Sequence, residues 1–341
     1  MATDGTGDTP TALPVRTLGR SGVPVTALGF GAAAVAGLYE EVGEEQAAAT
    51  LEAAWDAGIR YFDTAPHYGL GLSERRLGAA LRSRPRDAYT LSTKVGRLLE
   101  PYDGGGDDLA NGFAVPATHR RRWDFSADGV RRSLEASLTR LGLDRVDLVL
   151  LHDPDDHERQ AFDEAYPALE DLRAQGVVRA IGAGMNQTRM LARFVTDTDV
   201  DAVLCAGRYT LLDQGALQEL LPGAETAGKS VIVGGVFNSG LLADPAPGAT
   251  YDYAAAPGRL LRRALRMRDA TEALGVPLRA AALRFPFGHP AVAAVLVGAR
   301  SAAEARDAVE QYRRSVPGAV WEALRERDLL PPGAPTPGSA G

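Results

Sequence analysis

The chain has 341 residues, of which 45% are hydrophobic and 24% charged, an ordinary balance for a globular protein. Its formal net charge of −7 argues against a broad nucleic-acid interface, which needs a basic face. The single cysteine, Cys205, excludes an intrachain disulfide and is interpreted as a small core residue. No segment approaches the about 20 apolar residues of a membrane span, and residues 1–14 lack signal-peptide features, so we expect a cytoplasmic protein without a membrane partner.

Both ends of the chain are predicted to be disordered tails. Residues 1–13 are rich in Gly, Thr and Pro, and residues 329–341 carry repeated prolines that prevent a helix. One domain over residues 14–328 remains. We expect it to begin with a β-hairpin, in which Pro14–Leu18 and Val23–Val25 flank a Ser-Gly turn.

Between the tails, short apolar runs alternate with helical patterns. The expected strands are 25–30, 59–63, 89–94, 146–151, 177–183, 202–206, 230–234 and 292–297. The expected helices are 44–57, 73–81 with Ser73 as N-cap, 126–141, 163–175, 187–195, 213–221, 259–274, 277–285, 302–313 and 317–326. Eight strands, each followed by a helix, predict an α/β fold, a (β/α)8 TIM barrel with the N-terminal β-hairpin over its bottom and extra C-terminal helices. A doubly wound sheet is disfavoured because Gly29-Phe30-Gly31 is only a fragment of its phosphate-binding fingerprint.

Two connections, 95–125 and 235–258, are long for a compact domain. Both follow the carboxyl ends of strands, the face at which barrel active sites lie, so we expect them to be functional. The basic run Arg120–Arg122 falls in the first of them. We interpret it as a solvated loop tip, with a specific anion site as the alternative.

Three consecutive strands end in titratable residues, namely Asp63, Lys94 and His152, and Tyr68 follows Asp63 by five positions. This set suits proton transfer coupled to hydride transfer, because a carbonyl that accepts hydride needs a proton at once. A phenol, with a pKa near about 10, becomes a better acid/base group when an ammonium lowers that value. Asp63 would orient Lys94, and His152 would polarise the same substrate oxygen. Taken singly, each residue also has a structural explanation, as an ion pair, a packing aromatic or a core histidine.

These segments resemble the aldo-keto reductase superfamily over roughly residues 14–315. The resemblance implies a catalytic tetrad with Tyr68 as general acid/base, a TIM barrel, and NAD or NADP as cofactor. Within the superfamily the chain most resembles the sugar-oxidising branch with D-threo-aldose 1-dehydrogenase, L-fucose dehydrogenase and pyridoxal 4-dehydrogenase. The shared segments are Ser92–Leu99, Asp124–Ser126, Leu151–Asp155 and Gly184–Gln187. Membership of this branch implies oxidation of an aldose at C1 to the lactone.

The resemblance also implies cofactor contacts at the ends of the later strands. Asn186 would hold the nicotinamide carboxamide, although Met185 stands where the family usually has Ser, and Tyr209 would stack on the nicotinamide. Backbone amides would cradle the pyrophosphate at Gly235, Phe237, Asn238, Ser239, Gly240 and Leu241. Gly298, Arg300 and Glu304 resemble the adenosine end. Arg300 or Arg306 would pair with a 2′-phosphate, which leaves NAD versus NADP open.

The expected substrate contacts are His67, Arg97, Trp123 and Asp153, because a sugar needs directional hydrogen bonds and a flat apolar wall. No metal site is expected, since the acidic residues after His152 lack the Gly turn and distal Glu of a calcium loop. A second hypothesis is an NADPH-dependent reductase of a non-sugar aldehyde or ketone, such as pyridoxal or a secondary metabolite. A third is a non-catalytic cofactor-sensing regulatory subunit, against which the intact tetrad argues. Oligomeric state stays open.

Overall fold

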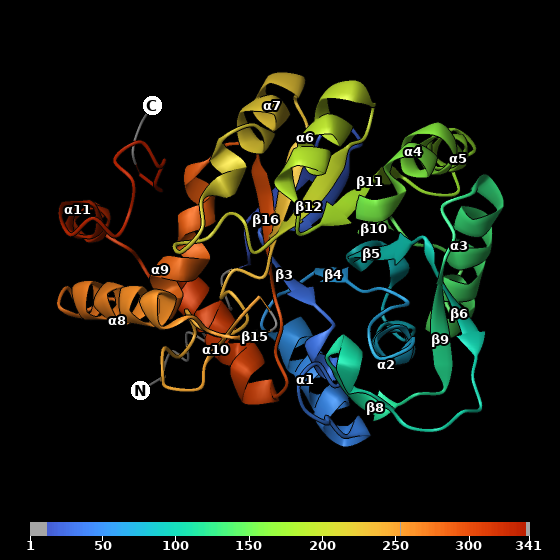
Figure 1. Cartoon of the computed structure of the whole chain (residues 1–341), viewed down its shortest axis with the longest axis horizontal. Helices are drawn as coiled ribbons and strands as arrows, with labels where there is room; N and C mark the ends of the chain where they lie inside the picture. Colours follow the sequence, from blue (N-terminus) through green and yellow to red (C-terminus); the bar gives the residue numbers. More distant parts are fainter. Residues whose placement is uncertain (1–11, 253, 339–341) are drawn as a thin grey trace, which may run out of the picture.

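The computed structural model describes residues 12–252 and 254–338, and their centre is a closed barrel of eight parallel strands (Figure 1). In spatial order the strands are β10 (Leu148–His152), β11 (Ala180–Met185), β12 (Ala202–Ala206), β13 (Ser230–Gly234), β16 (Val292–Val297), β3 (Leu28–Gly31), β4 (Tyr61–Asp63) and β5 (Thr90–Val95). The predicted (β/α)8 fold is confirmed. The predicted tails at 1–11 and 339–341 lie outside the described residues.

Helices surround the barrel and connect its strands (Figure 1). They are α1 (Glu44–Asp56), α2 (Leu72–Leu81), α3 (Ala127–Leu141), α4 (Glu158–Gln160), α5 (Tyr166–Ala174), α6 (Thr188–Asp197), α7 (Leu220–Ala227), α8 (Gly258–Glu272), α9 (Leu278–Arg284), α10 (Ala302–Arg313) and α11 (Gly318–Glu326). One π-helical turn, Ala161–Ala165, precedes α5. None of the helices within residues 12–252 and 254–338 is long and apolar enough to cross a bilayer.

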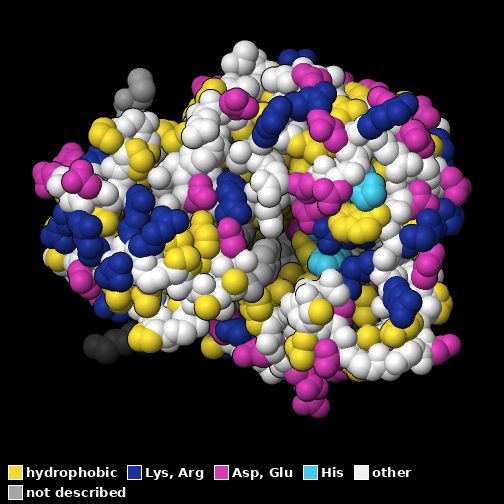
Figure 2. Space-filling view, in the orientation of Figure 1, with side chains coloured by type: hydrophobic (Ala, Val, Ile, Leu, Met, Phe, Trp, Pro, Cys, Tyr) yellow, Lys and Arg dark blue, Asp and Glu magenta, His cyan; other side chains and the backbone are white. Residues whose placement is uncertain are grey.

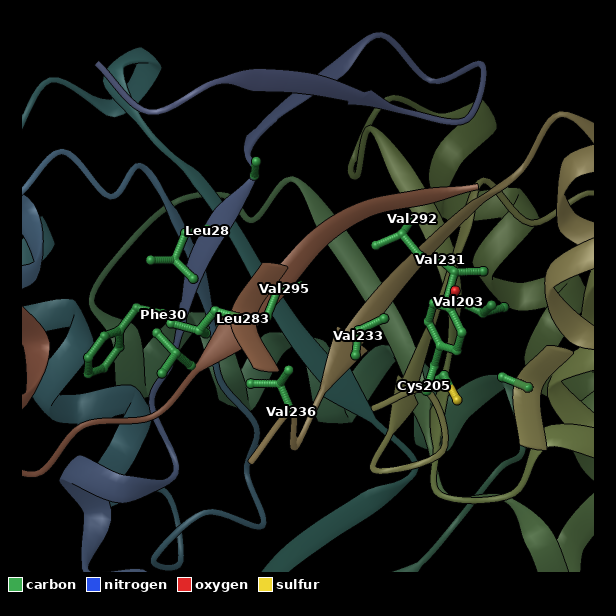
Figure 3. Close-up of a cluster of buried hydrophobic side chains, with 14 of the residues drawn as sticks. Leu28, Phe30, Val203, Cys205, Val231, Val233, Val236, Leu283, Val292 and Val295 are labelled. Carbon is green, nitrogen blue, oxygen red and sulfur yellow. The ribbon is translucent and has the colours of Figure 1, made fainter. Parts of the chain in front are cut away.

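The core has two layers because successive side chains of a strand point to opposite faces. In β10, Leu148 and Leu150 belong to the cluster inside the barrel, whereas Val149 and Leu151 belong to the larger cluster between strands and helices. Figure 3 shows part of the outer layer, where Val203, Val233 and Val295 come from three different strands. Cys205 lies in the same layer with no exposed surface, as predicted for a core residue.

The predicted hairpin closes one end of the barrel. Strands β1 (Val15–Leu18) and β2 (Val23–Thr26) pair antiparallel. Leu18, Val23 and Val25 are buried with Tyr61 and Leu148 in the cluster inside the barrel. The opposite end, at the carboxyl ends of the strands, therefore remains for binding and chemistry.

Ser73 does not cap α2, so that prediction is wrong. The N-cap is Gly71, with φ of 80°, and the helix begins at Leu72. The Ser73 hydroxyl donates to the Ala32 carbonyl over 2.9 Å and lies 2.7 Å from the Thr64 hydroxyl. A buried hydroxyl needs such partners, and here it ties the helix to the strand ends.

Residues 329–338 are packed rather than disordered, which corrects the expected tail for this stretch. Leu329, Leu330 and Ala334 are buried in the main core. Arg325 donates to the Ala334 carbonyl and to the Thr336 hydroxyl, each over 3.0 Å. The prolines exclude a helix here, but they do not prevent burial of apolar side chains.

The long connection 95–125 contains two antiparallel ribbons. Strand β6 (Arg97–Pro101) pairs with β9 (His119–Trp123), and β7 (Asp107–Asp108) pairs with β8 (Phe113–Pro116). The second connection, 235–258, holds the short pair β14 (Thr250–Tyr251) and β15 (Ala254–Ala255). Arg121 does not belong to a solvated loop tip, because its side chain is only 10% exposed and forms an ion pair with Asp108.

Candidate active site

Lys94 lies at the centre of a polar cluster at the ends of β4 and β5. Its Nζ donates to Asp63 Oδ2 over 2.6 Å, to the Thr64 carbonyl over 3.0 Å and to the Tyr68 hydroxyl over 3.0 Å. An ammonium has three hydrogens, so all of them are used. The side chain is 2% exposed, and the three bonds therefore fix its position.

The Asp63 carboxylate is held on both oxygens. Oδ1 accepts a hydrogen bond of 2.7 Å from the Ser92 hydroxyl, which also lies 3.1 Å from the Tyr61 hydroxyl. Sequence reasoning missed Ser92. The available signal was its spacing of two from Lys94 on one strand, which places both side chains on the face towards the barrel interior.

The ionisation of this cluster follows from its burial and its charges. Burial lowers the pKa of Lys94, but Asp63 and Tyr68 raise it more, so the net shift is upward and the ammonium stays charged. Burial raises the pKa of the Tyr68 phenol, and Lys94 opposes that effect without cancelling it. Lys94 thus lowers the phenol pKa as expected, but burial outweighs it, so the net pKa of Tyr68 lies above its ordinary value. Tyr68 is a phenol that accepts from Lys94 and keeps its own hydrogen.

His152, the last residue of β10, stands beside Tyr68. The two ring centroids are 5.8 Å apart with the planes at 87°. Burial, followed by the charges of Arg97 and Lys94, lowers the pKa of His152 well below its ordinary value, so the imidazole is neutral. Its Nδ1 is buried and has no hydrogen-bond partner among the residues that the structure describes. The structure thus brings all four predicted tetrad residues together.

The four predicted substrate residues surround this cluster. Arg97 forms an ion pair with Asp153, and its guanidinium lies 4.1 Å from the ring centroid of Trp123. The His67 ring lies 5.6 Å from the His152 ring and 6.0 Å from the Tyr68 ring. Figure 2 shows a hollow near the middle of the molecule, with histidine, acidic and basic side chains at its right-hand margin.

The ribbons of residues 97–123 contribute further residues that sequence reasoning missed. The Phe113 ring lies 5.3 Å from His67 and 6.1 Å from Tyr68. Arg121 hydrogen-bonds to His67 and to Asp108. Only the length of this connection signalled its importance, because nothing in the local sequence predicts how the ribbons fold back.

The predicted cofactor residues follow strands β11, β12, β13 and β16, so they lie at the same end of the barrel as the tetrad. Asn186 comes directly after β11 and is partly exposed. Asn238 is buried, and it donates to the Gly207 carbonyl over 3.2 Å and accepts from the Thr210 hydroxyl over 2.6 Å. This side chain therefore joins the loop after β13 to the loop after β12.

Two cofactor expectations need correction. Tyr209 has no exposed surface and packs against Phe285, with ring centroids 5.3 Å apart, so no face of its ring is open for stacking. The predicted amide cradle is also incomplete, because three amides donate to carbonyls of their own loop. These bonds are Asn238 to Gly235 at 2.8 Å, Gly240 to Phe237 at 3.1 Å and Leu241 to Asn238 at 3.3 Å.

The residues expected at the adenosine end form a charged group at the start of α10. Arg300 Nη1 lies 2.9 Å from Glu40, and its Nη2 lies 3.7 Å from Glu304. Glu304 also accepts from the Arg300 amide over 2.8 Å and donates its own amide to the Ser301 hydroxyl over 3.2 Å. Ser301 therefore caps the helix, and the Glu304 carboxylate balances Arg300.

Comparison with known proteins agrees with this geometry. Residues 27–328 match the model of the Aldo/keto reductase family. The chain belongs to this family. It is 46% identical to D-threo-aldose 1-dehydrogenase of a Pseudomonas species over 91% of this chain and 96% of that protein. It is 41% identical to pyridoxal 4-dehydrogenase of Microbacterium luteolum over 92% of this chain and 97% of that protein.

A solved structure has the same architecture. The holo form of an aldo-keto reductase from Bacillus halodurans superposes with a TM-score of 0.75 at 27% identity, over 93% of this chain and 96% of that one. This aldo-keto reductase is accordingly an NAD(P)-dependent oxidoreductase that acts on small molecules.

The strand ends of this aldo-keto reductase fit a flat cofactor ring. Gly184 on β11 faces the interior, where a Cβ would lie 3.5 Å from Lys94 Cε. At the end of β13, a Cβ on Gly234 would lie 3.2 Å from the Leu204 side chain. A side chain at Gly184 would reach Lys94, so a glycine here adds no bulk beside Lys94, where a nicotinamide ring next to Tyr68 would have to lie.

Proposed function

We propose that this enzyme oxidises an aldose at its C1 hydroxyl to the lactone, with Tyr68 as the acid/base residue. The observation that carries the proposal is the 3.0 Å hydrogen bond from Lys94 to Tyr68, made by an ammonium whose other hydrogens are held by Asp63 and the Thr64 carbonyl. The high identity to a D-threo-aldose 1-dehydrogenase supports the choice of substrate class.

In the direction of oxidation, Tyr68 first releases its own hydrogen to solvent, and the phenolate then accepts the proton of the C1 hydroxyl while the hydrogen on C1 departs as hydride. The charged Lys94 stabilises the phenolate that this role requires, and Asp63 keeps Lys94 charged. Neutral His152 contacts the same oxygen and stabilises it as the carbonyl forms. Bound NAD(P)+ supplies the hydride acceptor, with Asn186 on its carboxamide.

The charge balance of the site supports a neutral substrate. Lys94 is paired with Asp63, Arg97 with Asp153 and Arg121 with Asp108. No cation of this group is left to pair with a carboxylate or phosphate of the substrate. An uncharged polyol meets such a site with hydrogen bonds, and the Trp123 ring offers it a flat apolar wall.

The charges around Arg300 support NAD rather than NADP. A 2′-phosphate would have to compete with Glu40 and Glu304 for the guanidinium, and it would bring its own negative charge beside both. The ribose hydroxyl of NAD carries no such cost. We therefore propose NAD as the preferred cofactor.

The second candidate is oxidoreduction of a non-sugar carbonyl compound such as pyridoxal. The aromatic group formed by His67, Tyr68 and Phe113 favours a flat aromatic substrate, and the identity to a pyridoxal 4-dehydrogenase supports it. The chain belongs to a family of oxidoreductases and holds all four tetrad residues together. Both observations argue against a non-catalytic cofactor sensor.

The test is an assay of the purified protein with NAD+ or NADP+ and a panel of aldoses, including L-fucose, D-arabinose and L-galactose, with pyridoxal beside them. Reduction of NAD+ by an aldose, with the lactone identified as product, supports the proposal. Turnover of pyridoxal alone favours the second candidate. If no aldose reduces NAD+ or NADP+, the aldose assignment is wrong.

A further inference from the structure

A buried ion pair from the ribbons reaches into the substrate site. The Arg121 guanidinium bonds to the Asp108 carboxylate through two nitrogens, at 2.7 and 2.5 Å. The same guanidinium donates from Nε to His67 Nδ1 over 2.5 Å and from Nη2 to the His67 carbonyl over 2.8 Å. The two charged side chains are 10% and 5% exposed, so this fork is fixed within the protein.

These bonds determine where His67 carries its hydrogen. A guanidinium only donates, so His67 Nδ1 must accept, and in a neutral imidazole the hydrogen is then on Nε2. A protonated ring would direct an N–H at the Arg121 N–H and would lose this bond. Burial first, and then Arg97, Arg121 and Lys94, lower the pKa of His67 to about 2, so the ring stays neutral.

The Nε2 hydrogen remains for a ligand. Among the described residues, Nε2 of His67 has no hydrogen-bond partner, and the side chain is partly exposed. The ring stands nearly perpendicular to Phe113 and His152, at 88° and 75°, and lies 6.0 Å from Tyr68. The ring that carries this donor therefore lies beside Tyr68 and His152, the two groups that face the reacting oxygen.

We infer that Arg121 is a positioning residue that holds His67 as a hydrogen-bond donor to a second oxygen of the substrate, near the oxygen whose proton Tyr68 exchanges. This inference rests on the proposed function. It also gives a role to the ribbons of residues 97–123, which supply the Arg121–Asp108 ion pair. A substrate with an oxygen next to the reacting carbon, as in an aldose, gains this bond. A simple aldehyde has no oxygen there and does not.

The tautomer can be tested without turnover. Long-range ¹H–¹⁵N correlation spectra of the ¹⁵N-histidine-labelled full chain report the protonated nitrogen of each imidazole, and His67→Gln assigns the His67 signals. We expect His67 with its hydrogen on Nε2 and no titration between pH 5 and 9. A hydrogen on Nδ1, or a titrating His67, would overturn the inference whatever the enzyme turns over.

The substrate bond is tested by kinetics with the best aldose of the panel and with a simple aldehyde. Arg121→Met leaves Asp108 buried without its partner, so the double variant Arg121→Met/Asp108→Asn is made as well. We expect the double variant to raise KM for the aldose about tenfold, with kcat changed less than threefold and KM for the aldehyde unchanged. His67→Gln, which keeps a donor near Nε2, retains more aldose affinity than His67→Leu.

Arg120→Met is the matched control, because Arg120 is exposed on the same strand and stacks on Tyr102 at 3.8 Å. It leaves all constants at the wild-type values. Equal loss for aldose and aldehyde in the double variant, or equal constants for His67→Gln and His67→Leu, would contradict the positioning role. If the panel contains no substrate, the spectra still decide the tautomer, so the two proposals fail separately.

Discussion

The Tyr68 hydroxyl accepts a hydrogen bond from Lys94 over 3.0 Å, and this bond decides what the phenol is able to do. Because its oxygen accepts from the ammonium, its hydrogen is left to point at a ligand. In the direction of reduction, Tyr68 donates this hydrogen, and the phenolate that remains faces the positive charge of Lys94. Lys94 therefore supports both protonation states of Tyr68, which is the requirement for a reversible acid/base residue.

Replacement of that hydroxyl is the first prediction. Tyr68→Phe removes the acid/base group and keeps the ring beside His67, His152 and Phe113. General acid/base catalysis contributes about 100- to 10,000-fold, so we expect kcat to fall by at least about 100-fold. Titration of cofactor fluorescence should give an unchanged Kd for NAD(H). Turnover within threefold of the wild type would remove Tyr68 from its proposed role.

The buried pair of Lys94 and Asp63 gives a second prediction, on stability. Lys94→Met leaves the buried Asp63 carboxylate without its partner, which lowers the free energy of unfolding by about 3–5 kcal/mol. The double variant Asp63→Asn/Lys94→Met removes both charges and should recover most of this loss in urea titrations. It should remain inactive, since Tyr68 has lost its ammonium. A double variant less stable than Lys94→Met would contradict this account of the pair.

The tetrad was predictable because strand ends of a parallel barrel converge, so order along the chain gives position in space. Asp63, Lys94 and His152 each follow an apolar run, and the structure places them together. The direction of the Tyr68 pKa shift was not predictable, since burial and the ammonium oppose each other and only the packing shows which is larger. Ser92 was missed for a different reason, as a serine carries little signal until its partner is known.

Features set by long-range folding were beyond the sequence. Tyr209 follows a strand end as the other site residues do, yet its side chain turns into the outer core against Phe285. Arg121 sits in a basic run typical of a solvated loop, but Asp108 lies opposite it on a second ribbon. Composition describes what a segment prefers on average, whereas one well-placed partner decides what a single side chain does.

The third prediction concerns Trp123, which is 41% exposed and stacks on Arg97. Trp123→Ala removes the apolar wall and one neighbour of the guanidinium. We expect KM for an aldose to rise about tenfold, equal to about 1.4 kcal/mol, with kcat nearly constant. Leu109→Ala, on an exposed apolar residue in the turn between β7 and β8, is the control and should change neither constant. A fall in kcat at constant KM would contradict a role for Trp123 as a wall that contacts the bound substrate.

The fourth prediction tests cofactor choice at Glu40. Glu40→Gln removes one of the two carboxylates that face Arg300, so the guanidinium becomes a better partner for a 2′-phosphate. The preference for NAD over NADP, as a ratio of kcat/KM values, should fall about tenfold, or about 1.4 kcal/mol. Glu52→Gln removes a carboxylate paired with Arg84 and serves as the control. An unchanged ratio would show that Arg300 does not contact the 2′ position of the cofactor.

The last prediction is loss of stability in mild acid, caused by the two neutral histidines of the site. The pKa of His67 is lowered to about 2, chiefly by burial, and that of His152 is lowered well below its ordinary value of 6.5 for the same reason. Because the folded pKa lies below the unfolded one, the unfolded chain binds protons that the folded chain does not. Their contribution is complete above pH 6.5 and is lost as the pH falls below it.

The loss caused by His67 approaches about 1.4 kcal/mol per pH unit at pH values well below 6.5. Urea titrations at pH 8.5, 7.5, 6.5 and 5.5 measure it, with His67→Gln as the variant. Between pH 6.5 and 5.5 the free energy of unfolding of the variant should fall by about 1 kcal/mol less than that of the wild type. Between pH 8.5 and 7.5 the difference between the two proteins should stay constant. Parallel curves through the acidic range would mean that His67 is protonated in the folded protein, and the fork from Arg121 would then have to be abandoned.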